Sequence, residues 1–160
     1  MRKPHLFLKG FTLIELMVTL AIVAILASVA LPMLQMTVKK NKEVTLKNNL
    51  IQIREAIDAY KKAAEEGRIE QKIQDSGYPP NLQVLVDGVK DLKSPEGRKI
   101  KFLRRIPADP MLKSREDDAP KWGLRSYDSE YDDPKYEKDV FDVYSLSTEK
   151  DSHGVPYSKW

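Results

Sequence analysis

The sequence predicts an α+β fold in which one long N-terminal helix, first membrane-spanning and then amphipathic, packs on a small antiparallel β-sheet. Residues 11–36 form an almost unbroken apolar run. Residues 46–64 then carry apolar side chains at helical spacing, and two short segments in the C-terminal half have strand character. This order is expected of a helix that leaves a membrane and continues into a small domain.

The apolar run over 11–36 is long enough to cross a bilayer. As a helix, the 24 residues of 11–34 span roughly 36 Å, and a bilayer core is about 30 Å thick. Glu15 is the only ionisable residue in the run, and a carboxylate in hydrocarbon costs at least about 2.5 kcal/mol unless it is paired or protonated. A secretory signal peptide has a shorter apolar region followed by a small-residue cleavage site. A simple signal anchor fits the length and accounts for Glu15 only as a side chain that reaches the membrane surface.

The helix is predicted to continue beyond the membrane as an amphipathic segment over 37–66. Pro32 cannot donate a backbone hydrogen bond and is expected to kink or loosen the helix. Gly67 is a suitable C-cap residue. Apolar side chains alternate at spacings of four and three residues, which places them on one face: Leu46, Leu50, Ile53, Ile57, Tyr60 and Ala64.

A small globular domain is predicted over 67–160, covering this apolar face. Leu82, Leu85 and Val86 indicate a short helix, and residues 100–106 mix strand and loop features. Residues 122–127 and 140–146 predict two strands that pair antiparallel. The charged segment 128–139 between them is predicted to be a solvated loop.

Composition excludes several classes of function. Lys and Arg exceed Asp and Glu by 27 to 24, and the excess comes from Arg2, Lys3 and Lys9. The remaining chain is formally neutral, so no nucleic-acid partner is expected. The chain has no Cys and two distant His residues, which argues against a zinc site. We find no catalytic triad, P-loop or dinucleotide motif and expect no enzyme. A membrane-tethered periplasmic enzyme is the alternative outside the structural class.

Residues 9–15, KGFTLIE, resemble the processing motif of prepilins, the precursors of type IV pilin-like proteins. The resemblance implies a pilin-like fold and a leader peptide over 1–10. It also implies that prepilin peptidase cuts between Gly10 and Phe11 and methylates the new amine of Phe11. Glu15 then becomes the fifth residue of the mature chain and pairs with the N-terminal amine of a neighbouring subunit. The cut precedes the apolar run, so 11–36 is kept as a transmembrane and assembly helix.

The same resemblance implies the location of the protein. Basic residues flank the apolar run on both sides, so charge alone leaves the orientation open. Access for the peptidase implies a single-pass protein of the bacterial inner membrane, with a cytoplasmic N-terminus and a periplasmic C-terminal domain. The subunits are expected to assemble into a periplasmic filament.

The C-terminal half resembles the major pseudopilin of type II secretion in residues 102–110 (FLRRIPADP), a later Trp-Gly and residues 142–146 (DVYSL). This resemblance implies a structural subunit of a pseudopilus that supports protein secretion. The implied partners are further copies of the chain, minor pseudopilins and an inner-membrane assembly platform. A type IV pilus subunit for adhesion or motility is the alternative, which the lack of a C-terminal Cys pair slightly disfavours.

The same family places calcium-binding aspartates in the loop after Leu146. In this chain the candidate ligands are Leu146, Glu149 and Asp151, in a shorter loop. Calcium takes six to eight oxygen ligands, so these residues make a weak site at best. A plain charged turn is the favoured interpretation, and no cofactor is expected.

Overall fold

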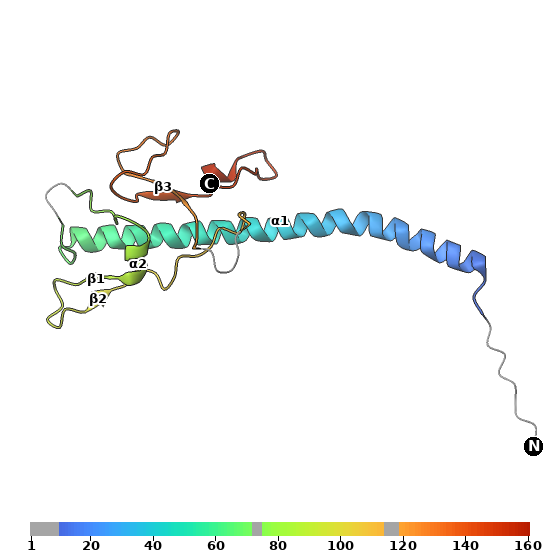
Figure 1. The fold of residues 1–160 in the computed structure, drawn as a ribbon, viewed down its shortest axis with the longest axis horizontal. Helices are drawn as coiled ribbons and strands as arrows, with labels where there is room; N and C mark the ends of the chain where they lie inside the picture. Colours follow the sequence, from blue (N-terminus) through green and yellow to red (C-terminus); the bar gives the residue numbers. More distant parts are fainter. Residues whose placement is uncertain (1–9, 72–74, 114–118) are drawn as a thin grey trace, which may run out of the picture. The chain divides into compact units, whose positions relative to one another are not determined.

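The computed structural model describes residues 10–71, 75–113 and 119–160 (Figure 1). The chain forms two compact units, Met1–Asn41 and Lys42–Trp160. Helix α1, Leu13–Glu65, contributes to both units, and every strand belongs to the second. The predicted α+β fold class is therefore confirmed.

Helix α1 has 53 residues and agrees with the predicted helix to within two residues at each end. Its helical assignment continues without a break through Pro32, since the proline ring removes only one backbone hydrogen bond. At the other end, Gly67 adopts a φ of 66°, and its N–H donates to the Ala64 carbonyl at 2.9 Å. The Arg68 N–H donates to the Ala63 carbonyl at 2.9 Å, which completes a Schellman motif and confirms Gly67 as the helix stop.

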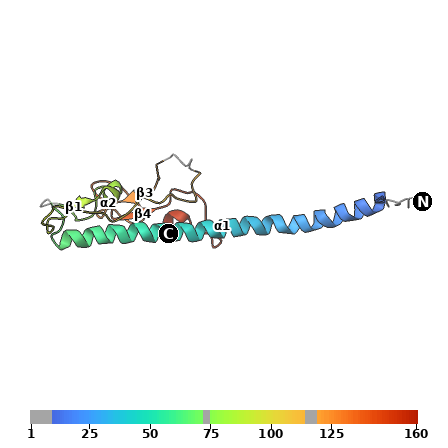
Figure 2. The same ribbon diagram turned by 90° about the horizontal axis from the view of Figure 1, so that it is seen from below.

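The core of the second unit forms on the predicted apolar face of α1. Leu46, Ile53 and Ile57 have no exposed surface, and the other members of the face are at most 8% exposed. The strands and α2 lie along one side of this part of α1 (Figure 2). Buried side chains from α2, β4, η1 and the segments that connect the elements complete the core: Leu82, Leu85, Leu103, Trp122, Val140, Val143 and Tyr157.

Helix α2, Gln83–Asp87, is the predicted short helix, and it leads into a hairpin that the sequence did not predict. Strand β1, Val89–Lys90, pairs antiparallel with β2, Lys99–Ile100. The Phe102 and Leu103 amides both donate to the Leu85 carbonyl at 2.9 Å, so backbone contacts fix this hairpin against α2. Strands of two residues are too short to show a period in sequence.

The predicted antiparallel pair is confirmed as β3, Gly123–Arg125, and β4, Asp142–Tyr144. The register pairs Leu124 with Val143, whose side chain is fully buried. Gly123 lies opposite Tyr144, and a β-carbon at this position would overlap the Tyr144 ring, so the pairing requires glycine. The chain ends with the 3₁₀ turn η1, Tyr157–Lys159. The described residues therefore form two small sheets where one was predicted.

The segment 128–139 is exposed over most of its length, as predicted, but the prediction was wrong for Asp139. This residue is only 7% exposed. Its carboxylate accepts hydrogen bonds from the Tyr127 amide at 2.9 Å and from the Ser76 hydroxyl. The Ser126 hydroxyl donates to the Asp139 carbonyl at 2.8 Å. A carboxylate satisfied in this way can be buried, and it closes the loop onto the domain.

Candidate processing and assembly site

The Gly10–Phe11 bond lies in an exposed segment without regular secondary structure, directly before α1. Residues 10–12 have no helical assignment, and Phe11 is 85% exposed. A β-carbon on Gly10 would meet no atom within 4 Å, and its φ is not positive. The fold therefore does not require glycine at this position. Of the predicted leader over 1–10, only Gly10 is among the described residues.

Thr12 and Glu15 form a reciprocal cap at the start of α1. The Thr12 hydroxyl oxygen accepts a hydrogen bond from the Glu15 amide at 3.2 Å. The Glu15 carboxylate in turn accepts from the Thr12 amide and the Thr12 hydroxyl, each at 3.2 Å. This is the capping box of a Ser/Thr-x-x-Glu sequence. The signal was present in the sequence, as Thr at 12 and Glu at 15, but the cap was not among the features predicted from it.

The capping box leaves the Glu15 carboxylate accessible. One carboxylate oxygen of Glu15 accepts both hydrogen bonds from Thr12. At 3.2 Å, both are long for charge-assisted hydrogen bonds, and both are exposed to solvent. A carboxylate has about four acceptor positions, so most of its capacity remains available to another donor. The site can thus hold the helix start in an isolated subunit and accept a cationic group from elsewhere.

Behind this cap, the first unit exposes an apolar helix surface. The described large apolar side chains of 13–34 are between 51% and 78% exposed: Leu13, Ile14, Leu16, Met17, Val18, Leu20, Ile22, Val23, Ile25, Leu26, Met33 and Leu34. By length and composition, α1 is the one helix in the described residues that is suited to cross a membrane. Apolar surface of this extent is stable only in lipid or against other proteins.

The segment 102–110 holds the second unit together through its backbone carbonyls. The Trp122 indole N–H donates to the Pro107 carbonyl at 2.8 Å. The Asn49 side-chain amide, from α1, donates to the Ala108 carbonyl at 2.9 Å. These contacts join α1 and the start of β3 to one loop.

Asp109 and Ser145 connect the two segments that carry the pseudopilin resemblance. Asp109 is 3% exposed and Ser145 has no exposed surface. The Ser145 hydroxyl donates to one Asp109 carboxylate oxygen at 2.6 Å, and the Met111 amide donates to the other at 2.8 Å. Removing one partner of such a buried pair costs about 1–3 kcal/mol. These residues are structural in the fold and do not face a ligand site.

Arg54 is a polar connection that the sequence patterns did not indicate. Its side chain lies beside the apolar face of α1 and pairs with Asp142 at 2.8 Å. It also donates to the Val143 carbonyl at 3.1 Å and to the Trp160 carbonyl at 2.7 Å. One guanidinium therefore joins α1, β4 and the last described residue.

Tyr157 fixes η1 to α1. Its ring is fully buried, and its hydroxyl donates to the Glu43 carboxylate at 2.7 Å. Burial raises the pKa of Tyr157, and the hydrogen bond to Glu43 raises it further. The phenol is thus held protonated, as a donor, at all physiological pH values.

Two of the candidate calcium ligands in the loop after Leu146, Glu149 and Asp151, take part in the loop's own hydrogen bonds. One Asp151 carboxylate oxygen accepts from the His153 amide at 2.8 Å and the Val155 amide at 2.9 Å, which shapes a turn. The Glu149 carbonyl accepts from the Tyr157 amide at 3.2 Å. Within the described residues, no group of three or more Asp, Glu, His or Cys side chains is arranged to hold a metal ion. One Asp151 carboxylate oxygen and the Glu149 carbonyl are therefore already hydrogen-bonded within the loop.

Calcium is accordingly expected to leave the stability of the purified full-length protein unchanged. The melting temperature should be the same in millimolar calcium and in a chelator, because a ligand raises stability only when it binds the folded state. Differential scanning fluorimetry in detergent measures this directly, with magnesium as the control cation. A rise of several degrees that is specific to calcium, and is lost in Asp151→Asn, would contradict it.

The comparisons with known proteins agree with this site. Residues 9–31 match the family model described as the prokaryotic N-terminal methylation motif. The type II secretion system core protein G of Klebsiella michiganensis is 32% identical over 108 residues, covering 64% of this chain and 67% of the relative. Its counterpart in Vibrio cholerae is 28% identical over 148 residues, covering 91% of this chain and 84% of the relative. The type IV major alpha-pilin of Moraxella bovis is 45% identical over 51 residues, 32% of each chain. No solved structure matches the chain.

The methylation motif, the capped apolar helix and the small domain on its second half define a pilin-like protein of the prepilin type. Identity and coverage are then specific enough for a narrower assignment. The chain belongs to the family of type II secretion system core protein G, the major pseudopilins.

Proposed function

We propose that this protein is a structural subunit of a periplasmic pseudopilus that supports type II protein secretion. Prepilin peptidase cuts the precursor between Gly10 and Phe11 and methylates Phe11. Residues 11–36 anchor the mature subunit in the inner membrane, and the domain after the helix lies in the periplasm. An inner-membrane assembly platform then adds it to a polymer of the same subunit and minor pseudopilins.

The exposed apolar half of α1 with a single carboxylate near its start is the observation that carries this proposal. A soluble enzyme rarely exposes an apolar surface of this extent. A simple membrane anchor does not need a carboxylate in its span, where the charge is costly. In a polymer, neighbouring helices cover the apolar surface, and the Phe11 amine of one subunit can pair with Glu15 of another. We therefore propose a structural and not a catalytic role.

A type IV pilus subunit is the second candidate. It is favoured by the local identity to the Moraxella bovis alpha-pilin, which is limited to 51 residues. The longer similarity to core protein G, which extends into the C-terminal domain, favours the secretion pseudopilus.

Deletion of the gene tests these alternatives. We expect the deletion strain to retain its secreted proteins in the periplasm and to keep surface pili and twitching motility. Proteomics of the culture medium and microscopy of the cell surface measure the two outcomes, and plasmid-borne wild-type protein is the control. Loss of pili with normal secretion would support the pilus subunit, and normal behaviour in both assays would contradict an assembly role.

A further inference from the structure

Residues 89–105 form a strongly basic surface, here called the basic hairpin. They contain β1, β2 and the residues that follow, with seven Lys or Arg against two Asp or Glu. All seven cationic side chains are exposed: Lys90, Lys93, Arg98, Lys99, Lys101, Arg104 and Arg105. A net charge of +5 in seventeen residues is far from the formally neutral average of the chain after its first ten residues.

The two acids of the basic hairpin are already neutralised within the subunit. Asp91 pairs with Arg68, which lies outside the hairpin, at 2.6 Å, and the Arg68 guanidinium holds the pKa of Asp91 below its usual range. Glu96 pairs with Arg98 at 2.6 Å. By contrast, Lys99 and Lys101 form no ion pair with any residue that the structure describes. The hairpin therefore presents uncompensated positive charge.

Residues 127–139 form a surface of the opposite charge, here called the acidic loop. They contain six Asp or Glu against two Lys, and all of the acids except Asp139 are exposed. Glu130 and Glu137 form no ion pair within the described part of the chain. Three tyrosines of this loop are also more than half exposed: Tyr127, Tyr131 and Tyr136. Tyrosine beside carboxylate is well suited to hold Arg or Lys, through cation–π contacts and charge.

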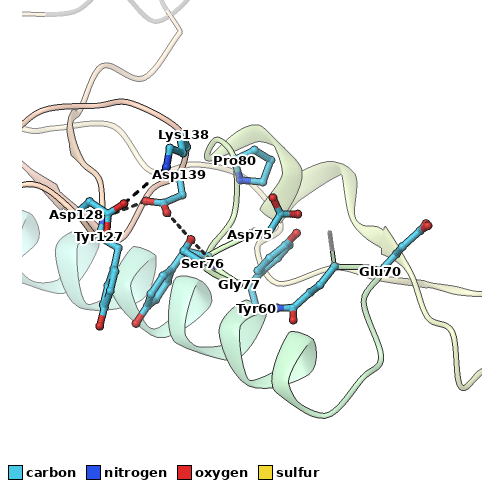
Figure 3. A pocket seen from close by; sticks show the side chains of 12 residues that line it. Tyr60, Glu70, Asp75, Ser76, Gly77, Pro80, Tyr127, Asp128, Lys138 and Asp139 are labelled. Atoms are coloured by element: carbon cyan, nitrogen blue, oxygen red, sulfur yellow. Dashed lines mark hydrogen bonds and ion pairs between the residues drawn. The ribbon is translucent and has the colours of Figure 1, made fainter. Parts of the chain in front are cut away.

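The acidic loop borders a cavity of about 640 Å³ whose wall is also rich in carboxylates and tyrosine rings. Its wall carries the carboxylates of Glu70, Asp75, Asp128 and Asp139 and three tyrosine rings, against the single ammonium of Lys138. Figure 3 shows Tyr127 and Asp128 at one side of this cavity and Tyr60 with Asp75 at the other. The Lys61 ammonium of the same chain already lies 5.2 Å from the centre of the neighbouring Tyr78 ring. The region thus accommodates cationic side chains.

The two charged surfaces cannot satisfy each other within one subunit. They belong to separate sheets, and β1 and β2 lie on one flank of α1 while the loop after β3 lies on the other (Figure 1). Two different complementary patches on one chain make a heterologous contact, which is repeated from copy to copy and builds an open helical polymer when the rotation between copies does not close a ring. A second copy of this chain is therefore the partner that fits both surfaces at once.

We propose that the basic hairpin of one subunit docks on the acidic loop and adjoining cavity of another, in the membrane and in the filament. This inference rests on the proposed function, since it concerns the polymer's contacts outside the apolar helices. Apolar helix packing tolerates sliding and rotation, whereas charge pairs between domains fix orientation and register. Both surfaces are solvent-exposed, so salt in solution screens their charges, with a screening length of about 8 Å at physiological ionic strength. The contact should therefore weaken as the salt concentration is raised.

A charge swap in the full-length chain tests the contact. Lys99→Glu with Lys101→Glu is expected to lower filament yield at least about tenfold, and Glu130→Lys with Glu137→Lys should do the same. All four changes in one chain should restore filaments, because the two surfaces become complementary again. Lys113→Glu with Lys121→Glu changes the net charge equally and should leave yield unaffected. Normal filaments in the first two variants, or no recovery in the combined one, would overturn the docking contact.

Crosslinking provides a second measurement that does not require filaments. The chain has no Cys, so one tagged copy can carry Lys99→Cys and a differently tagged copy Glu130→Cys. In membranes holding both copies, a short bismaleimide should join the two tags, while Lys121→Cys in place of Lys99→Cys should give no product.

The two measurements separate the inference from the proposed function. Crosslinks from the control pair alone, or from neither pair, would overturn the docking contact even if wild-type filaments form. Wild-type cells that make no filaments and secrete normally would overturn the proposed function, and the crosslink would still decide the contact. Blocked secretion with normal filaments in the Lys99→Glu, Lys101→Glu variant, together with no crosslink between Lys99→Cys and Glu130→Cys, would assign the basic hairpin to another partner and reject the inference.

Discussion

Replacing Glu15 with leucine is expected to abolish filament assembly while leaving membrane insertion and cleavage after Gly10 intact. The helix would keep its apolar length, so insertion should not suffer. A carboxylate in hydrocarbon costs about 2.5–3.5 kcal/mol when alone, and a neighbouring Phe11 ammonium would remove this cost by pairing with it. Leucine cannot pair with an ammonium group, so the proposed contact that fixes one subunit against the next would be lost.

The capping box makes a matched set of controls possible. Glu15→Gln keeps an oxygen that can accept from the Thr12 amide but removes the charge. Thr12→Val removes the hydroxyl that accepts from the Glu15 amide but keeps the carboxylate. Losing a helix cap costs about 1 kcal/mol, so Thr12→Val should assemble nearly normally. Glu15→Gln should fail like Glu15→Leu if charge pairing, and not capping, drives assembly.

Filament yield by electron microscopy, measured beside an immunoblot for processing, separates these possibilities. Wild-type assembly by Glu15→Leu would reject the pairing mechanism and favour a simple membrane anchor. Equal failure of Thr12→Val and Glu15→Leu would instead show that the helix start must be formed for assembly.

Replacing Gly10 with leucine is expected to stop maturation almost completely. A β-carbon at this position meets no atom within 4 Å, and the backbone is not in the left-handed region. The subunit should therefore fold normally, with α1 still beginning at Leu13. A block would then be attributed to the proposed peptidase step, if the peptidase accepts only a backbone without a side chain before the scissile bond. The uncut chain would also lack the free Phe11 amine that we propose as the partner of Glu15.

Mass spectrometry of the membrane-bound protein measures this prediction. The wild type should begin at N-methylated Phe11, and Gly10→Leu should remain uncut, with Gly10→Ala between them. Gly154→Ala is the control for a glycine change far from the scissile bond: its φ of 82° makes alanine strained there, so it should destabilise the C-terminal domain but leave cleavage after Gly10 unchanged. A wild-type chain that begins near Thr37 or remains uncut would contradict the prepilin interpretation.

Local sequence patterns predicted α1 and the strand pair of β3 and β4. The apolar face of α1 was found because spacings of three and four residues repeat over five turns, and all six of its members are buried. Gly67 was identified as the helix stop because a left-handed C-cap favours glycine. The Thr12–Glu15 cap was equally local and could have been found from the Thr-x-x-Glu pattern.

Burial of individual polar residues was not predictable in the same way. Asp139 lies in a segment whose other acids are exposed, and only its contacts with Ser76 and Tyr127 explain why it is buried. The Asp109–Ser145 hydrogen bond joins residues 36 positions apart, and the Arg54–Asp142 pair joins residues 88 positions apart. Nothing in the neighbouring sequence marks these residues as partners.

Sequence patterns were enough to predict the long helix, its division into an exposed apolar half and an amphipathic half, and the residues of the processing motif. These features depend on periodicity and on neighbours within a few positions, which a single chain displays directly. The tertiary structure alone decided the split into two small sheets and the polar contacts among α1, β4 and the 102–110 segment. It also separated the basic hairpin from the acidic loop, because the approach of distant residues depends on packing, and packing is a property of the whole fold.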